Sequence, residues 1–188
     1  MKTKISKVLF LLLLAAKVVA QEPVPERPPF IVKDPSVIHF ELIPSDDRGF
    51  DKRDDSLNKP YEEGAQIVIG MDAVNTSQEA VRIIVFNQWS QDRPELLRSG
   101  DKVEYRKEIR KGVEQSEWQP PDAQAQVVKL EPGKRLRIAS FQLHTWYGPL
   151  EAGHYQLVVK HRFQHGQEWI ASAPIIFEVV LKKRDTRQ

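Results

Sequence analysis

Histidine is the residue type here best suited to acid–base or metal chemistry, and it occurs five times, as His39, His144, His154, His161 and His165. His161 and His165 are four residues apart, but they lie where a predicted strand runs into a turn. That spacing does not place two imidazoles around one metal ion. Alternate residues of a strand share a face, so His161 lies on the face of Leu157 and Val159. We therefore interpret His161 as a hydrogen-bonded, half-buried side chain and predict no metal site.

The other sequence signals of catalysis are absent or weak. The 188 residues include no cysteine, which excludes thiol nucleophiles, thiolate zinc sites, iron–sulfur clusters and disulfides. The sequence has no nucleophile elbow, phosphate-binding glycine loop, dinucleotide fingerprint or His-Glu-x-x-His motif. Carboxylates are plentiful, but none has an apolar context that would raise its pKa. We predict no catalytic residues and no cofactor, and therefore a protein that is not an enzyme.

Two local motifs carry weaker chemical signals. The acidic segment Ser45–Gly64 has the composition of a cation site, but Arg48, Lys52 and Arg53 lie among its acids and would repel a cation. We expect this segment to be a solvated loop. Asn75-Thr76-Ser77 is formally an N-glycosylation sequon, which matters only in a eukaryotic secretory pathway.

Aromatic side chains in predicted loops are the candidate binding residues, namely Trp118, Trp146 and Tyr147. Large aromatics bury much area at low entropic cost, so on exposed loops they can anchor a protein or sugar partner. The alternative is that Trp146 and Tyr147 close one end of the fold as a small core under a loop, and we favour it. Trp89 and Trp169 adjoin predicted strands, and we expect them in the core.

The first 20 residues have the pattern of a secretory signal peptide. A lysine-rich start precedes the short apolar run Val8–Ala16, and Val18 and Ala20 provide small residues before a cleavage site at Gln21. The run is far shorter than the roughly 20 residues that span a bilayer. We therefore predict a secreted or periplasmic protein with no integral membrane span.

The leader also explains the basic charge of the chain. The formal net charge of +2 comes from 28 basic and 26 acidic residues, and four of the lysines lie in the leader. Without them, 24 basic residues face 26 acidic ones, a net charge of −2. Nucleic-acid binding needs clustered basic residues on a folded face, so we do not predict that partner. A short basic tail, Lys182–Gln188, ends the chain.

Period-two hydrophobic patterns dominate the rest of the chain. The segment Gln21–Pro35 holds five prolines and is predicted to be an extended spacer. Beyond it, Ser36–Leu181 forms the predicted domain, with apolar residues alternating in segments at 36–43, 65–74, 81–86, 94–98, 102–109, 127–130, 135–143, 154–163 and 173–181. No stretch has a convincing helical spacing. We predict an all-β fold, an antiparallel two-sheet sandwich of about eight or nine strands.

Turn and loop signals separate these strands. Ser99-Gly100-Asp101 is the predicted turn of a hairpin, and Gly112–Gln126 is a predicted long loop. Glu131-Pro132-Gly133-Lys134 has proline and glycine at the favoured central positions of a turn. The apolar positions change parity within 135–143, which predicts a β-bulge near Ala139 or Ser140.

One motif resembles a known family. The residues Leu150–Leu157 read Leu-Glu-Ala-Gly-His-Tyr-Gln-Leu and resemble the tyrosine corner of immunoglobulin-like domains. Antibody domains carry a cysteine two residues after that tyrosine, where this chain has Leu157. With the preceding Leu130-Glu131-Pro132-Gly133, the pattern resembles cysteine-free bacterial secreted sandwich domains, and the bacillar intracellular proteinase inhibitor is similar in outline. The resemblance covers Ser36–Leu181 and implies a fold without assigning a function.

Three functional hypotheses follow. The first is an exported, non-catalytic binding or structural module that acts on a protein or cell-envelope component. The second is a proteinase inhibitor that presents a loop such as Gly112–Gln126 to a protease. The third is a carbohydrate-binding module that uses Trp118 or Trp146.

Overall fold

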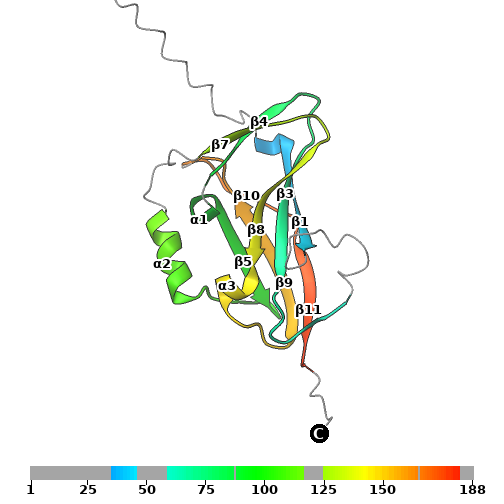
Figure 1. Ribbon diagram of the computed structural model, residues 1–188, viewed down its shortest axis with the longest axis vertical. Coiled ribbons are helices and arrows are strands. Elements are labelled where there is room, and N and C mark those ends of the chain that lie inside the picture. Colours follow the sequence, from blue (N-terminus) through cyan, green and yellow to red (C-terminus); the bar gives the residue numbers. More distant parts are fainter. Residues whose placement is uncertain (1–34, 46–58, 87, 117–124, 165, 183–188) are drawn as a thin grey trace, which may run out of the picture.

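Strands are more extensive than helices in the structure. The computed structural model describes residues 35–45, 59–86, 88–116, 125–164 and 166–182 (Figure 1). The strands are β1 (Ile38–Ser45), β2 (Tyr61–Glu62), β3 (Val68–Asn75), β4 (Val81–Val85), β5 (Asp92–Arg98), β6 (Asp101–Lys102), β7 (Gln126–Leu130), β8 (Arg135–Gln142), β9 (Gly153–His161), β10 (Ile170–Ala171) and β11 (Ile175–Val180). The helical segments are η1 (Pro35–Val37), α1 (Gln88–Gln91), α2 (Lys107–Ser116) and α3 (Leu143–Tyr147).

The strands form three sheets. One has the order β1-β3-β8, and a second has the order β2-β11-β9-β5-β6 with β10 added beside β9. The third is the pair β4-β7, whose strands follow β3 and precede β8 along the chain. Among the described strands every pairing is antiparallel except that of β2 with β11. The predicted all-β class is therefore confirmed.

The two larger sheets pack against each other through one hydrophobic core. Every second residue of Tyr155–Val159 is buried, as are Phe177 and Val179 on β11, as the period-two pattern predicts. The ring of Phe40, from β1 in the other sheet, lies 5.9 Å from the ring of Phe163. Residues of both sheets belong to the same buried cluster, and β3 and β8 cross over β5 and β9 in Figure 1.

The turns place the strands much as the sequence predicts. Leu97 and Arg98 pair with Lys102 and Asp101 around a two-residue turn, in which Gly100 adopts a φ of 93°. The turn at 131–134 closes with a hydrogen bond from Lys134 N to Glu131 O at 3.0 Å.

The predicted β-bulge lies slightly earlier than expected. Met71 of β3 is opposite Ala139, whereas Asp72 is opposite Arg137, so the register shifts by one residue at Ile138. The change of parity marked the correct strand. The extra residue precedes the first of the two predicted positions.

Helix α2 corrects two predictions. The second arm of the hairpin, predicted to run through 102–109, is only two residues long in β6. Lys107–Ser116 is instead a helix, so the predicted loop Gly112–Gln126 begins inside it. The buried residues Ile109, Val113 and Ser116 lie four and three positions apart, which places them on one helical face.

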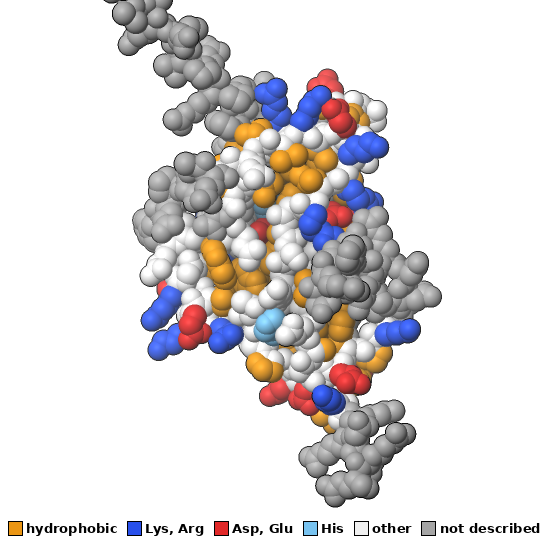
Figure 2. Space-filling view, in the orientation of Figure 1, with side chains coloured by type: hydrophobic (Ala, Val, Ile, Leu, Met, Phe, Trp, Pro, Cys, Tyr) orange, Lys and Arg blue, Asp and Glu red, His pale blue; other side chains and the backbone are white. Residues whose placement is uncertain are grey.

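The predicted leader, and nearly all of the spacer and the basic tail, lie outside the described residues, as do residues 46–58 of the acidic segment. The described end of that segment, predicted to be a loop, contains the short strand β2. Within the described part of the chain, no helix has the length and hydrophobicity needed to cross a bilayer. On the face shown in Figure 2, charged side chains lie mainly around the periphery and hydrophobic side chains between them.

The central strand β3 is buried on both faces. On its outer face, the absence of a side chain at Gly70 leaves room for the side chain of Arg137. A Cβ at Gly70 would lie 2.1 Å from Arg137 Nη1, so the guanidinium rests directly on the backbone of β3. In this position Arg137 Nε donates to Asp72 Oδ1 at 2.5 Å, and Asp72 is almost fully buried. The absence of a side chain at Gly70 therefore positions an ion pair on the outer face of the three-stranded sheet.

Gly70→Ala is expected to displace Arg137 and to lower the free energy of unfolding by about 1–3 kcal/mol, the cost of weakening a buried polar contact. Urea denaturation measures the effect. The same substitution in an Arg137→Ala background is the control, and there it is expected to cost less because the clashing group is gone. Equal costs in both backgrounds would contradict this explanation.

Candidate functional site

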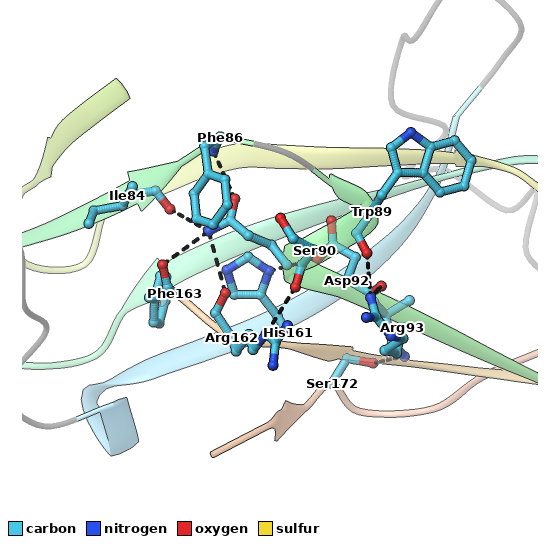
Figure 3. A network of polar contacts seen from close by, with 12 residues as sticks. Ile84, Phe86, Trp89, Ser90, Asp92, Arg93, His161, Arg162, Phe163 and Ser172 are labelled. Atoms are coloured by element: carbon cyan, nitrogen blue, oxygen red, sulfur yellow. Dashed lines mark hydrogen bonds and ion pairs between the residues drawn. The ribbon is translucent and has the colours of Figure 1, made fainter. Parts of the chain in front are cut away.

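The most concentrated group of buried polar side chains lies where β5 begins and β9 ends (Figure 3). Asp92 and His161 are direct cross-strand partners in the β5–β9 register. His161 Nδ1 lies 2.7 Å from Asp92 Oδ1, and each residue is only 2% exposed. Burial raises the pKa of Asp92, although the neighbouring His161 and Arg93 act to lower it.

The second imidazole nitrogen of His161 faces a hydrophobic environment. Nε2 is buried and has no hydrogen-bond partner among the described residues. The ring makes edge-to-face contacts with Phe40 at 5.0 Å and with Phe163 at 4.8 Å between centroids. An Asp–His pair serves as a general base when the free nitrogen faces a substrate. Here that nitrogen is buried in the hydrophobic core, so the pair is part of the interior of the fold and does not have the exposed nitrogen of a general base.

Gln91 connects this pair to the end of β4. Its Oε1 accepts a hydrogen bond from Phe86 N at 2.8 Å, and its Nε2 donates to Ile84 O at 2.9 Å. Nε2 also lies within 3.4 Å of the carbonyl oxygens of Arg162 and Phe163, and the Gln91 carbonyl accepts Arg162 N at 2.9 Å. The buried side-chain amide of Gln91 therefore provides hydrogen-bond partners for backbone groups at the ends of β4 and β9, where strand pairing stops. Buried backbone groups need such partners.

Two arginines border the outer side of this network. Arg162 Nε donates to Ser90 O at 2.9 Å, and Arg93 Nη1 donates to Trp89 O at 2.6 Å. Both guanidinium carbons lie over the ring of Trp169, at 4.9 Å for Arg93 and 4.5 Å for Arg162. Trp169, predicted to be in the core, is half-buried beneath these two cations.

The predicted binding residue Trp146 is buried. It is 1% exposed and lies against the rings of Trp89, Tyr105 and Phe141 at 4.9, 5.5 and 5.9 Å. Its indole has no free surface to offer a partner, which corrects the idea of Trp146 as an exposed anchor. The position matches the alternative of an aromatic group that closes one side of the fold.

Tyr147 belongs to the same aromatic group. It is half-buried, and its hydroxyl and that of Tyr105 each donate to Pro94 O at 2.6 Å. Burial raises the pKa of Tyr105 to about 12 and also raises the pKa of Tyr147, so both hydroxyls remain protonated donors. The two tyrosines thus satisfy a carbonyl of β5 at a point where β6 does not pair with it. The third candidate, Trp118, lies outside the described residues.

Sequence reasoning missed Asp92 and Gln91. The sequence predicts that His161 lies on an apolar strand face and is half-buried, whereas in the structure it is almost fully buried. Its partner Asp92 is 69 positions away in the sequence, so no local spacing joins the two. In the described residues there is no group of three or more histidine, aspartate or glutamate side chains that would hold a metal ion.

Tyr155 belongs to the motif that resembles a tyrosine corner. Tyr155 is buried at the start of β9, and its hydroxyl donates to Glu151 O at 2.8 Å. The side chain of Arg98 crosses Gly153 nearby and pairs with Glu151 at 2.5 Å.

The outer face of the six-stranded sheet carries a row of side chains that is apolar at Ile176 and Leu97 and polar at Gln156 between them. Ile176, Gln156 and Leu97 are consecutive cross-strand partners on β11, β9 and β5. Ile176 is 67% exposed, and Gln156 and Leu97 are half-buried, as is the neighbouring Val158. The ion pair between Lys160 and Glu95, at 2.8 Å, borders this row.

Comparison with known proteins yields little. No family model and no curated protein matches the chain. Among solved structures, the β-glucosidase from Listeria innocua is similar in complex with glucose (14% identity, TM-score 0.32) and with isofagomine (16% identity, TM-score 0.32). In each case the match covers 76% of this chain and 16% of the β-glucosidase chain. At these TM-scores the likeness carries no argument about this protein.

Proposed function

We propose that this chain is an exported, non-catalytic β-sandwich module of immunoglobulin-like type that binds a protein or cell-envelope component. Export rests on the leader pattern of the first 20 residues. The sandwich type is supported by two facing sheets with a common core and by the hydrogen bond from Tyr155 to Glu151. The sealing of the Asp92–His161 pair supports a role other than acid–base catalysis, because a substrate does not reach His161 Nε2.

The exposed side chain of Ile176 is the observation that carries the binding role. An isoleucine on a strand face gains free energy when a partner covers it, and the half-buried Leu97 and Val158 widen the apolar area. The Lys160–Glu95 pair provides a charged border, which is the usual arrangement of an apolar centre with a polar rim. The partner that fits is a protein with an apolar side chain surrounded by polar groups.

Ile176→Asp is expected to weaken partner binding by about tenfold or more, because a charge replaces the apolar centre. The experiment isolates partners from envelope extract with a tagged chain beginning at Gln21, and then measures the affinity of the captured protein for each variant. Leu181→Asp is the matched control, since Leu181 is 71% exposed but lies beyond the end of β11. If the captured protein bound the two variants with equal affinity, the proposal that Ile176 lies in the binding surface would be contradicted.

The other two hypotheses lose support from the described residues. The loop needed by the inhibitor hypothesis begins within α2, and residues 117–124 lie outside the described part of the chain. The carbohydrate hypothesis relied on Trp146, which is buried, or on Trp118, which is not described. Neither hypothesis has an observation in its favour.

A further inference from the structure

The two edges of the six-stranded sheet differ in how their outward backbone groups are bound. On β5, Leu96 O accepts a hydrogen bond from Val103 N at 2.8 Å, so Leu96 and, two residues earlier, Pro94 face away from β9. Pro94 has no N–H, and its carbonyl accepts the hydroxyls of Tyr105 and Tyr147, each at 2.6 Å. This part of the β5 edge is therefore closed to a further strand, as the edges of natural sheets commonly are.

The opposite edge, along β11, is covered only at one end. The short strand β2 pairs there with Val179 and Val180, and Glu63 N donates to Val180 O at 2.8 Å. Because Val180 faces β2, Ile176, four residues earlier, directs its N–H and carbonyl to the same edge. Among the described residues, no strand pairs with β11 on that edge opposite Ile176. Ile176 therefore offers a backbone donor and acceptor at the edge, beside its own exposed side chain.

Acidic side chains lie beside Ile176 on the outer face of the sheet. Glu178 lies two residues further along β11 and so shares the face of Ile176. Glu62 of β2 is the cross-strand partner of Val180, the next residue of that face. Both glutamates are exposed. A strand that matches this edge would carry an apolar residue opposite Ile176 and a basic residue opposite Glu178, because opposite charges across a strand pair attract.

We propose that the partner binds by adding a strand to this edge of β11, with an apolar residue opposite Ile176 and a lysine or arginine opposite Glu178. In strand addition the main-chain hydrogen bonds provide affinity, and alternate side chains of the added strand provide specificity. The inference rests on the proposed function, because it names the geometry in which Ile176 meets its partner. A second copy of the chain fits less well, since antiparallel pairing about Ile176 would place Pro174 opposite Glu178, where a cation is wanted.

Amide hydrogen exchange of the unmodified full chain, followed by nuclear magnetic resonance, tests the added strand directly. The probes are synthetic peptides of about nine residues with a central valine, and with lysine or, as the matched control, glutamate two positions to either side of it. At saturation the lysine peptide is expected to slow exchange of the Ile176 amide about tenfold or more. The Phe177 amide, which faces β9, is the internal control and is expected to be unchanged.

Three results of this measurement would overturn the proposal. The first is that neither peptide slows exchange at Ile176. The second is an Ile176 amide that is already protected in the free chain at every protein concentration, which would show that the chain covers its own edge. The third is protection that rises with protein concentration in the absence of peptide, which would identify a second copy as the occupant.

Two substitutions at Ile176 separate strand addition from contact through the side chain alone. Ile176→Ala removes the apolar side chain and keeps the N–H, whereas Ile176→Pro removes both. Proline is tolerated at edge positions whose N–H faces outward, so we expect both variants to fold, and urea denaturation checks this. Ile176→Pro is expected to bind the lysine peptide about fivefold more weakly than Ile176→Ala, as for the loss of one hydrogen bond.

The same comparison distinguishes failure of this inference from failure of the proposed function. Equal affinities of Ile176→Ala and Ile176→Pro, both weaker than that of the unmodified chain, would contradict strand addition but leave Ile176 as a binding residue. Equal affinities of all three chains would contradict the binding role itself. Glu178→Lys tests the charge, and it is expected to shift the preference from the lysine peptide toward the glutamate peptide by about two- to fivefold. An unchanged preference would contradict the basic residue assigned to the partner.

Discussion

Trp146→Ala is expected to lower the free energy of unfolding by about 3–5 kcal/mol, the range for removing a large aromatic side chain from a core. Trp146 is among the largest fully buried side chains, and rings from α1, β8 and the segment before α2 contact it. The cavity would open at the junction of the two sheets and the helices, where collapse is restricted. Urea denaturation followed by circular dichroism measures the change in stability.

Tyr147→Phe is the matched control for this prediction. It removes one hydroxyl from the same aromatic group but leaves Tyr105 as a donor to Pro94 O. We expect a loss of about 0.5–1.5 kcal/mol, as for a single hydrogen bond. A loss of stability for Trp146→Ala no larger than this would contradict its role in the core. Loss of partner binding with unchanged stability would show instead that Trp146 is a binding residue.

The strands of the core could be predicted from the sequence because their burial has a simple period. In β9 the inward residues alternate regularly with half-buried ones, and the pattern needs no knowledge of the partner strand. The turn at Gly133 was predictable for a similar reason, since its φ of 67° suits glycine. The Tyr155 contact is also local, because its acceptor Glu151 is only four residues away.

Helix α2 escaped prediction because its apolar face is narrow. Its buried residues Ile109, Val113 and Ser116 have helical spacing, but one of the three is polar and Gly112 interrupts the segment. Charged residues occupy most of the remaining positions, so the local composition reads as a loop. The helix is stabilised by tertiary contacts, such as the hydrogen bond from Ser116 Oγ to Trp89 O at 2.6 Å.

The candidate site could not be predicted because its contacts are long-range. Nothing near His161 in the sequence identifies Asp92 as its partner, and the contact exists only because β5 and β9 are adjacent in one register. The outer row depends on the same strand order, since Ile176 and Leu97 lie on either side of Gln156 in β9. Periodicity predicts which face a residue occupies but not which strands are neighbours.

The sequon residue Asn75 has a structural role that its motif does not suggest. Asn75 is 0% exposed and lies where the paired strands β3 and β8 give way to β4 and β7. Its Nδ2 donates to Leu130 O at 2.9 Å and to Glu79 O at 2.7 Å. Its Oδ1 accepts hydrogen bonds from both the backbone and the hydroxyl of Ser77, at 3.0 and 2.8 Å. In the folded state the amide nitrogen is therefore enclosed and unavailable for glycosylation.

Asn75→Asp is expected to lower the free energy of unfolding by about 2–4 kcal/mol, because two carbonyl oxygens lose their donor and face a carboxylate instead. Gln78→Ala changes an exposed residue of the same loop and is expected to have an effect within about 0.5 kcal/mol. Urea denaturation of both variants measures the difference.

A second measurement follows from the enclosed amide: expression in a glycosylating eukaryotic host should yield folded protein without a glycan at Asn75. Folded, glycosylated protein would show that the junction tolerates loss of these hydrogen bonds, and a small effect of Asn75→Asp would lead to the same conclusion.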